Sequence, residues 1–469
     1  MIYLDRNREE PLYMQIYSQI VNEIMDGTLK ENQILSGSRG LAKTLGVSRN
    51  TVDGAYNQLL AEGYVSSRRG IGYVVMKVPE LTRNRRQKPK VPEEPKTVPE
   101  NPAVLYDLTN SSHTSDLFPK SLWKRCTLEC LELLDQEKKL SSLQDKQGEA
   151  YLRRNLLSYL QRIRGVRCTE DQLIITAGIQ QSLEYICKLL SGDGRTILME
   201  EPGFNKAAAV FLNNDMEVRT VPVDENGLVV SKLPSLPGVR AVYSTPSHQF
   251  PTGVTLSIGR RYELLKWAEY HHAYIIEDDF DSEQRYYAKP IPSLQSIDGS
   301  GSVIYLGTFS KALSPSIRMG YMILPPQLLD IYLTKFKNYN STVPLLNQYI
   351  IGKLIETGQY DRHIRRLNHV FRKRLELFLS EFSDVKEKIK ISSNGTGQYF
   401  LLEFSGDVSQ QALIDRALEQ GVRVYSTMQF WHDKADCPPN TLFLGFSKIA
   451  LEDITDCVKR LKTAWSTWL

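Results

Sequence analysis

Apolar side chains recur at helical spacing through the first part of the chain. Four of them lie four positions apart and predict one apolar stripe along a helix that ends before Gly27: Leu12, Ile16, Ile20 and Ile24. Two more helices are predicted on either side of a turn at Gly46, with Ser48 placed to cap the second of them. Extended runs at 65–67 and 73–76 flank Gly70 and predict a hairpin. Three helices followed by a hairpin are typical of a winged helix-turn-helix.

The pattern changes after residue 105, where short apolar runs alternate with stretches of helix length. The runs lie at 173–176, 196–199, 241–244, 274–277, 303–306 and 321–324. Runs that are apolar at consecutive positions indicate a mostly parallel sheet buried on both faces, and such sheets bind ligands at the carboxyl ends of their strands. Long helices from about residue 345 precede four further runs, at 388–392, 399–404, 423–425 and 442–446. We therefore predict an α/β fold with a smaller α+β subdomain at the C-terminal end.

The composition changes sharply between Pro79 and Pro102, where 24 residues contain six prolines and ten charged side chains. Proline stiffens the chain and the charges keep it solvated, so we expect a semi-extended tether. A long loop inside one domain is the alternative, which is disfavoured because structureless loops of this length are uncommon in compact domains. The predicted organisation is a head at 1–78, a linker at 79–104 and a second domain at 105–469.

Overall composition is that of a folded protein without a membrane segment. The 469 residues are 41% hydrophobic and 24% charged, and the net charge of +4 means that any nucleic-acid footprint must be local. The acidic residues among the first 25 argue against a signal peptide, and no apolar run approaches the roughly 18 residues of a membrane helix. Six cysteines without a Cys-x-x-Cys pair predict reduced thiols and no metal site. We expect a cytoplasmic protein.

Cations and hydroxyls collect on the second and third predicted helices and at the presumed wing tip. The candidate DNA-binding residues are Arg39, Ser48, Arg49, Thr51, Arg68, Arg69 and Gly70. Such a surface suits phosphates and groove edges. A solvated, charged helix pair would give the same pattern on the helices, and the two arginines beside Gly70 favour DNA binding.

Polar motifs also follow the predicted strands of the second domain, and one group of them can bind a phosphate. A Gly-x-Gln turn at 178–180 opens a helix and offers backbone N–H groups to an anion. Thr308 adds a hydroxyl group, and Arg318 adds a planar fork of donors.

Lys311 lies three residues after Thr308 and seven before Arg318, which tethers an amine to the phosphate site, as a Schiff-base cofactor requires. Asp278 can keep a pyridine nitrogen protonated, and Phe204 can stack on the ring. Each residue alone has an ordinary structural interpretation, such as a surface lysine or a core phenylalanine. The ordered set of motifs at strand ends favours a cofactor site.

Both halves of the chain resemble known families. Residues 8 to 78 resemble the GntR-type DNA-binding domain in the segments PLYMQIYSQI, SRGLAKTLGVSRNTVDGAYNQLLAEGYV and RRGIGYVV. Residues from about 105 to 465 resemble fold-type I aminotransferases in segments that include GEAYLRRNLLSYLQRIRGVRCTEDQLIITAGIQQSL, EPGF, TPSHQFPTG, IIEDDFDSEQRY and GTFSKALSPSIRMGY. With both parts present, the whole chain resembles the MocR (GabR-like) family of transcriptional regulators.

The resemblance implies a set of partners and roles. Lys311 would form the internal aldimine with pyridoxal 5′-phosphate, Asp278 would pair with the ring nitrogen, and Phe204 would stack on the ring. The phosphate would take the backbone of Gly178, Ile179 and Gln180 together with Thr308 and Arg318. The resemblance also implies a homodimer that binds promoter DNA and a small amino compound as effector.

Four positions depart from the pattern of active aminotransferases. Phe280 and Phe250 stand where a tyrosine and an asparagine hydrogen-bond the phenolic oxygen of the cofactor. Leu143 stands in place of a tyrosine that reaches the partner subunit, and Phe443 in place of the arginine that binds the substrate carboxylate. Arg423 is a candidate replacement for that arginine.

These departures separate the possible functions. Catalysis requires groups that move protons and orient the substrate, whereas sensing requires only differential binding. The sequence therefore favours a transcriptional regulator that senses an amino compound through external aldimine formation. The alternative is a catalytically active aminotransferase with an accessory DNA-binding head. A third reading, a binder with an inactive cofactor site, is opposed by the retained lysine, aspartate and arginine.

Overall fold

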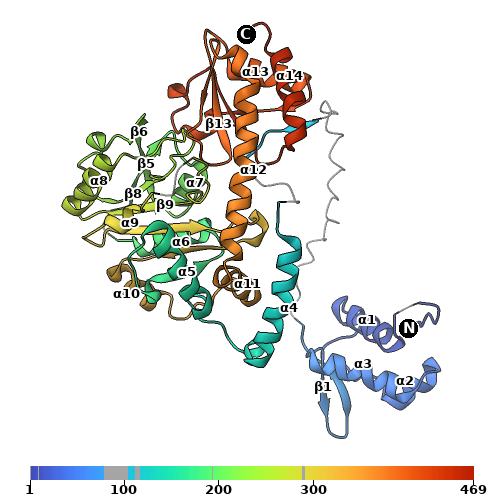
Figure 1. The fold of residues 1–469 in the computed structure, drawn as a ribbon. Helices are drawn as coiled ribbons and strands as arrows, with labels where there is room; N and C mark the ends of the chain where they lie inside the picture. Colours follow the sequence, from blue (N-terminus) through green and yellow to red (C-terminus); the bar gives the residue numbers. More distant parts are fainter. Residues whose placement is uncertain (1, 9, 79–103, 111–116, 193, 288–290) are drawn as a thin grey trace. The chain divides into compact units, whose positions relative to one another are not determined.

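The computed structural model describes residues 2–8, 10–78, 104–110, 117–192, 194–287 and 291–469 (Figure 1). The chain divides into two compact units, Met1–Pro99 and Glu100–Leu469, which are considered separately below. The linker predicted at 79–104 falls almost entirely outside the described residues, so its boundaries stay a prediction.

The first unit has the winged helix-turn-helix arrangement that the sequence predicts. Its elements are α1 (Leu12–Met25), α2 (Ser38–Leu45), α3 (Arg49–Ala61), β1 (Val65–Arg68) and β2 (Gly72–Val75). The two strands pair antiparallel, with Val65 opposite Val75, and form the wing. Ser48 caps α3 as predicted, because its hydroxyl accepts the backbone N–H of Thr51 at 3.1 Å. The stripe on α1 is buried against α3, where Val52 and Ala55 are fully buried.

The second unit contains an eight-stranded sheet in the order β4-β11-β10-β9-β8-β5-β6-β7. The strands are β4 (Leu173–Thr176), β5 (Thr196–Glu201), β6 (Glu217–Asp224), β7 (Gly227–Leu228), β8 (Val239–Ser244), β9 (Tyr274–Asp278), β10 (Val303–Thr308) and β11 (Gly320–Ile323). The five neighbours from β10 to β6 are parallel, which confirms the mostly parallel sheet. β11 runs antiparallel to both of its neighbours, a direction that apolar runs do not encode.

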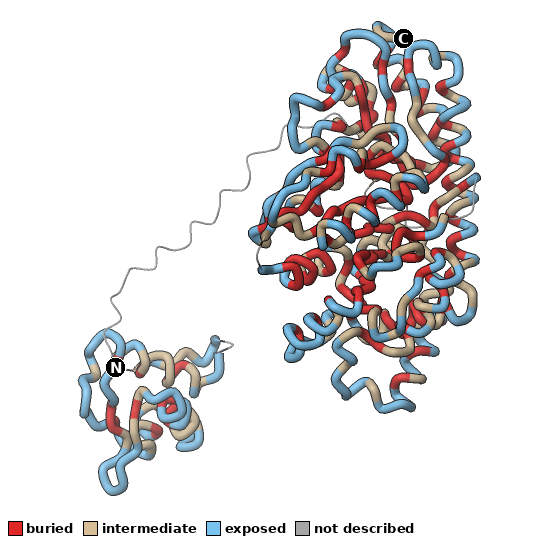
Figure 2. Tube along the Cα trace, turned by 90° about the vertical axis from the view of Figure 1, so that its left-hand side faces the viewer, coloured by how far each residue is buried: buried red, intermediate tan, exposed pale blue. Residues whose placement is uncertain are grey.

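Helices cover both faces of this sheet (Figure 1). They are α4 (Lys120–Gln136), α5 (Ala150–Arg164), α6 (Ile179–Leu189), α7 (Asn205–Asn213), α8 (Ile258–His271), α9 (Leu294–Ile297), α10 (Pro326–Lys335) and α11 (Leu345–Glu356). Alternate residues of β4 enter different cores: Ile174 packs in one cluster, and Leu173 and Ile175 in another. This two-sided burial is why the strands are apolar at consecutive positions. Figure 2 shows the buried residues concentrated in the sheet and the inner sides of its helices.

The C-terminal subdomain is the predicted α+β layer. It comprises α12 (Gln359–Glu381), β12 (Ile389–Ser392), β13 (Tyr399–Phe404), α13 (Gln410–Glu419), β14 (Val422–Arg423), β15 (Tyr425–Ser426), β16 (Thr441–Gly445) and α14 (Ile454–Ala464). The prediction of a single strand at 423–425 is wrong, because the chain changes partners at Val424. β15 joins β16, whereas β14 pairs in parallel with β3 (Tyr106–Asp107), far away in the sequence.

Membrane-spanning helices and metal-binding clusters are both absent from the described residues. No helix in that part of the chain is both long and apolar enough to cross a membrane. No group of three histidine, cysteine or acidic side chains is placed there to hold a metal ion.

Candidate functional site

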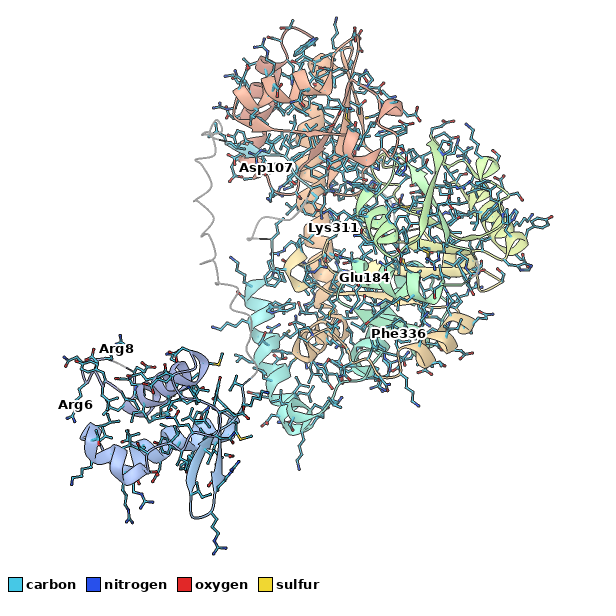
Figure 3. The ribbon with its side chains drawn as sticks, turned by 180° about the vertical axis from the view of Figure 1, so that it is seen from behind. Arg6, Arg8, Asp107, Glu184, Lys311 and Phe336 are labelled. Carbon is cyan, nitrogen blue, oxygen red and sulfur yellow. The ribbon has the colours of Figure 1, made fainter. Side chains whose placement is uncertain are left out.

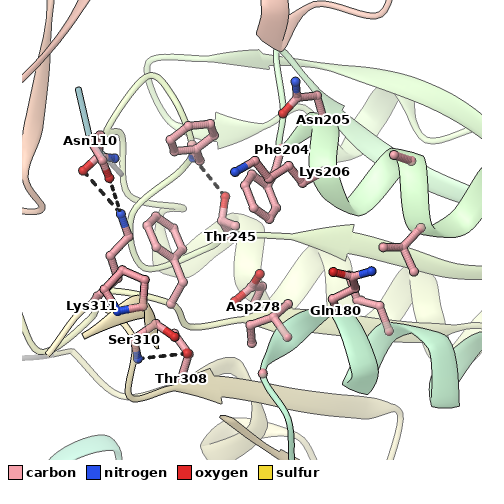
Figure 4. A pocket seen from close by; sticks show the side chains of 18 of the residues that line it. Asn110, Gln180, Phe204, Asn205, Lys206, Thr245, Asp278, Thr308, Ser310 and Lys311 are labelled. Carbon is pink, nitrogen blue, oxygen red and sulfur yellow. Dashed lines mark hydrogen bonds between the residues drawn. The ribbon is translucent and has the colours of Figure 1, made fainter. Parts of the chain in front are cut away.

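A cavity of about 660 Å³ lies at the carboxyl ends of the parallel strands (Figure 4). All eight residues that the sequence proposes for the cofactor line it: Gly178, Ile179, Gln180, Phe204, Asp278, Thr308, Lys311 and Arg318. They come from four strand ends and from the helices and loops that follow. The sheet therefore brings together motifs that are up to 140 residues apart in the chain.

One end of the cavity has the features of an anion site. Gly178 precedes α6 with φ of +95°, and a Cβ atom at this position would lie 3.2 Å from the Nη2 atom of Arg318. The positive φ favours glycine here, and a Cβ atom would also crowd the guanidinium, which donates to the carbonyl of Ala177 at 3.3 Å. The first turn of α6 presents backbone N–H groups, and Thr308 adds its hydroxyl. This combination suits a phosphate group.

Asp278 ends β9 at the base of the cavity and is 2% exposed. The hydroxyl of Tyr243 donates to its Oδ2 atom at 2.5 Å, while the buried Oδ1 atom has no hydrogen-bond partner among the described residues. Burial raises the pKa of this carboxyl to about 7, although the bond from Tyr243 acts in the opposite direction. A cationic N–H donor in the cavity would satisfy Oδ1, and the protonated nitrogen of a pyridine ring is such a donor.

Lys311 extends from the loop after β10, and its amine donates to the main-chain oxygen of Asn110 at 3.0 Å and to its Oδ1 atom at 3.3 Å (Figure 4). Burial lowers the pKa of Lys311 to about 8. The carboxylate of Asp281 raises this pKa and the amine of Lys206 lowers it further. A larger neutral fraction near neutral pH makes Lys311 a better nucleophile than an ordinary lysine.

An aromatic wall occupies three of the four positions where the sequence departs from active aminotransferases: Phe250, Phe280 and Phe443. Phe250 is 8% exposed and contacts the rings of Phe280, Phe430 and Phe443 at centroid distances of 4.9–6.1 Å. All four rings line the cavity. None of them can donate a hydrogen bond, so this wall offers no polar contact to a cofactor oxygen or a substrate carboxylate.

The suggested replacement for the missing carboxylate clamp is corrected by the structure. Arg423 lies on β14 opposite Asp107 of β3 and is not among the residues that line the cavity. Besides Lys311 and Arg318, the cavity is lined by one cation that the sequence analysis did not name, Lys206, two residues after Phe204 (Figure 4). The sequence analysis also did not identify Asn110, Tyr243 and Ser310 as lining residues. Of these three, only Ser310 could have been found from the sequence, because it is next to Lys311.

The candidate DNA-binding residues lie on the surface of the head. Six of the seven are exposed, and Thr51 is half-buried: Arg39, Ser48, Arg49, Arg68, Arg69 and Gly70 are the exposed ones. Arg49 begins α3, and its Nε atom lies 3.2 Å from Oδ2 of Asp53 one turn later. Gly70 adopts φ of +79° in the turn between the two wing strands.

Arg6 is a further cation of the head, and no pattern in the sequence identified it as a candidate DNA-binding residue. Its Nη2 atom donates to the carbonyl of Gly46, in the turn between α2 and α3, at 2.9 Å. The N-terminal arm that carries Arg6 is fixed to α1, since Gln19 exchanges hydrogen bonds with the backbone of Tyr3 and Gln15 with that of Asp5. Arg6 and Arg8 of this arm are labelled in Figure 3.

Comparisons with known proteins agree with both halves of this description. Residues 12–75 match the bacterial regulatory proteins of the gntR family, and residues 117–432 match aminotransferase class I and II. Among solved structures, a multiple substrate aminotransferase from Thermococcus profundus shares 28% identity and a TM-score of 0.70, over 78% of this chain and 92% of that one. This similarity confirms the predicted fold class of the second domain.

Full-length relatives join the two halves in one chain. The chain is 34% identical to YhdI of Bacillus subtilis (strain 168), an uncharacterized HTH-type transcriptional regulator, over 99% of this chain and 98% of that protein. It is 30% identical to the probable rhizopine catabolism regulatory protein MocR of Rhizobium meliloti, over 99% and 96% of the two chains. The chain thus belongs to the family of transcriptional regulators that carry a GntR-type helix-turn-helix head fused to an aminotransferase class I and II domain.

Proposed function

We propose that this regulator binds pyridoxal 5′-phosphate, recognises a small amino compound at Lys311, and changes its binding to promoter DNA in response. The observation that carries this proposal is the buried Oδ1 atom of Asp278, which has no hydrogen-bond partner among the described residues, in a side chain that lines the same cavity as Lys311 and the anion site. Pyridoxal phosphate supplies an aldehyde that condenses with amines, a ring nitrogen that needs an acidic partner, and a phosphate. We place such a DNA-bound regulator in the cytoplasm.

Each residue of the site would make one of the interactions with the cofactor. Asp278 would hold the ring nitrogen in its protonated form, and Phe204 would pack on the ring face. The backbone at 178–180, with Thr308 and Arg318, would bind the phosphate. Lys311 would supply the amine that binds the aldehyde covalently, and its pKa of about 8 keeps a sizeable neutral fraction available.

The aromatic wall supports sensing over turnover. Phe250 and Phe280 give no hydrogen bond to a phenolic oxygen, and Phe443 gives no charge to a carboxylate. Transamination depends on orienting the substrate for proton transfer, and the loss of such groups costs orders of magnitude in rate. Binding of an amine needs none of these contacts.

The exposed leucines near α4 support a homodimer. Leu128, Leu140 and Leu143 are 56%, 54% and 87% exposed, and Leu131 on the same helix is 37% exposed. Apolar side chains gathered on one surface segment are typical of a face that a partner buries. We propose that a second copy of this chain covers them.

The proposed function is tested by screening primary amines against full-length protein loaded with pyridoxal phosphate. We expect one class of amine to change the absorption of the bound cofactor and, at the same concentration, the affinity for duplex DNA. Rapid multiple turnover with a keto-acid acceptor would instead establish the aminotransferase. An amine that changes the spectrum but leaves DNA affinity unchanged would contradict regulation.

Replacing Asp278 by asparagine should weaken the binding of pyridoxal phosphate. A hydrogen bond between charged groups is worth about 1.5–3 kcal/mol, so we expect a loss of roughly 10- to 150-fold in affinity. Equilibrium titration followed by absorbance measures this loss, and Tyr243→Phe serves as the control that leaves the carboxylate in place. Equal affinities for Asp278→Asn and the unmodified chain would contradict the assignment.

Covalent capture of pyridoxal phosphate should depend on pH through the neutral form of Lys311. Because its pKa is lowered from 10.5 to about 8, the rate should rise with pH up to about 8 and then level off. Asp281→Asn removes a charge that raises this pKa, so the midpoint should move below 8; Lys206→Gln removes a charge that lowers it, so the midpoint should move above 8. Stopped-flow absorbance measures both profiles. Shifts in the same direction would contradict this electrostatic account.

Arg6→Ala should weaken DNA binding to all sequences alike, because Arg6 stands beside the turn that precedes α3 and would contact a phosphate. We expect the slope of log affinity against log salt to fall by about 1. Arg8→Ala is the matched control, since Arg8 lies on the same arm and is paired with Asp5 at 3.8 Å. Equal effects of the two substitutions would show that only net charge matters.

A further inference from the structure

Lys311 joins two parts of the second unit that are distant in the sequence. Its loop follows β10 of the large sheet, whereas its acceptor Asn110 lies 201 residues earlier, just after β3. Figure 4 shows the two side chains pointing toward each other, with both hydrogen bonds drawn. The amine proposed to bind the cofactor is thus hydrogen-bonded directly to the segment 104–110.

This segment is built into the C-terminal subdomain. The backbone N–H of Leu105 donates to Gly421 at 2.8 Å, and that of Leu108 donates to Arg423 at 3.0 Å. The N–H of Gly445 donates to the carbonyl of Leu108 at 2.7 Å, and the Leu108 side chain is fully buried. Because the segment is hydrogen-bonded to the C-terminal subdomain, we expect a displacement of Asn110 to move that subdomain with it.

The same segment is where the second unit connects to the head. Residue 104 is the first described residue after position 78, so the covalent chain leads from the DNA-binding unit through 79–103 directly into β3. Any displacement of segment 104–110 changes the attachment point of the head.

The chemistry of the Lys311 nitrogen determines whether it can make these two bonds. A free amine carries two N–H donors, or three when protonated, which is enough for both oxygens of Asn110. Condensation with an aldehyde releases water and leaves the nitrogen with one N–H at most. When a primary amine takes over the aldehyde carbon, it gives up its two protons and Lys311 regains two, so the free amine is restored.

From this we propose that Asn110 is a positioning residue that couples the chemical state of Lys311 to segment 104–110. When the Lys311 nitrogen is covalently engaged, it has one N–H at most, so at least one of the two bonds to Asn110 is lost and the segment is held less firmly. When an effector amine frees Lys311, the bonds form and hold the small subdomain, and with it the attachment of the head, against the large sheet. This inference rests on the proposed function and specifies its regulation.

Two substitutions at Lys311 separate the bonds from the covalent chemistry. Lys311→Arg keeps N–H donors but cannot form the Schiff base, and Lys311→Met has neither property. In full-length protein without cofactor, we expect the amides of 104–110 to exchange hydrogen about tenfold more slowly in Lys311→Arg than in Lys311→Met. Hydrogen–deuterium exchange with mass spectrometry measures this.

The unmodified chain can be measured in two states that match the two variants. Without cofactor it should resemble Lys311→Arg, and with pyridoxal phosphate bound as the unreduced Schiff base it should shift toward Lys311→Met; borohydride is applied only to a parallel sample, to confirm the adduct by mass. Lys311→Met with added pyridoxal phosphate controls for the cofactor itself, and Asn110→Ala should reduce the difference because it removes the Oδ1 acceptor. Equal exchange in all states, with the reduced adduct confirmed by mass, would overturn the coupling alone. Absence of the adduct would overturn the proposed function and the coupling together.

Discussion

Lys311→Ala should abolish the covalent attachment of pyridoxal phosphate. Full-length protein treated with the cofactor and borohydride should carry one reduced adduct per chain, and the variant should carry none, because Lys311 is the amine tethered between Thr308 and Arg318 of the anion site. The yellow colour of the loaded protein should be lost as well. Intact-protein and peptide mass spectrometry measure the adduct and its location.

Lys206→Ala provides the matched control for this experiment. Lys206 also lines the cavity and its charge affects Lys311, but it is exposed and lies at the start of α7 rather than on the loop between Thr308 and Arg318. This variant should keep the adduct. We expect Lys311→Ala to fold normally, since the buried amine is costly to charge and its removal leaves no unpaired cation. An adduct that persists in Lys311→Ala would show that another lysine is the nucleophile.

Arg49→Ala should give the second large effect, on DNA recognition. Arg49 begins α3, and its ion pair with Asp53 orients the guanidinium along the exposed side of that helix. Arginine at the start of a recognition helix reads base edges in the major groove, so we expect a loss of about 1–3 kcal/mol in affinity for the preferred site and a relaxed sequence preference. Selection from random duplexes, followed by binding at several salt concentrations, measures both.

Arg39→Ala is the comparison for Arg49. Arg39 lies on α2, where side chains meet the phosphate backbone, so its loss should weaken preferred and random duplexes equally. A uniform loss for Arg49→Ala as well would assign Arg49 to a phosphate. No loss for either variant would contradict the predicted orientation of the head on DNA.

Regular elements with a strong burial pattern were predictable from the sequence. Strands that are buried on both faces are apolar at consecutive positions, as 173–175 of β4 and 303–306 of β10 illustrate. β6 was not predicted because it lies near the sheet edge, where half of its residues are exposed and only Val221 is buried, so no apolar run results. The break at Val424 and the antiparallel direction of β11 also escaped, because apolar residues encode burial and not the identity of the strand partner.

The sequence by itself determined the two-part architecture and the residues proposed for the cofactor, from Gly178 to Arg318, because each follows a recognisable strand and carries a side chain suited to one part of the ligand. Only the tertiary structure decided which groups surround them. Asn110 reaches Lys311 through the parallel pairing of β3 with β14, and Tyr243 reaches Asp278 through neighbouring strands. Arg423, by contrast, is carried away from the cavity by that same pairing. Contacts of this kind depend on sheet order and register, which local sequence spacing does not contain.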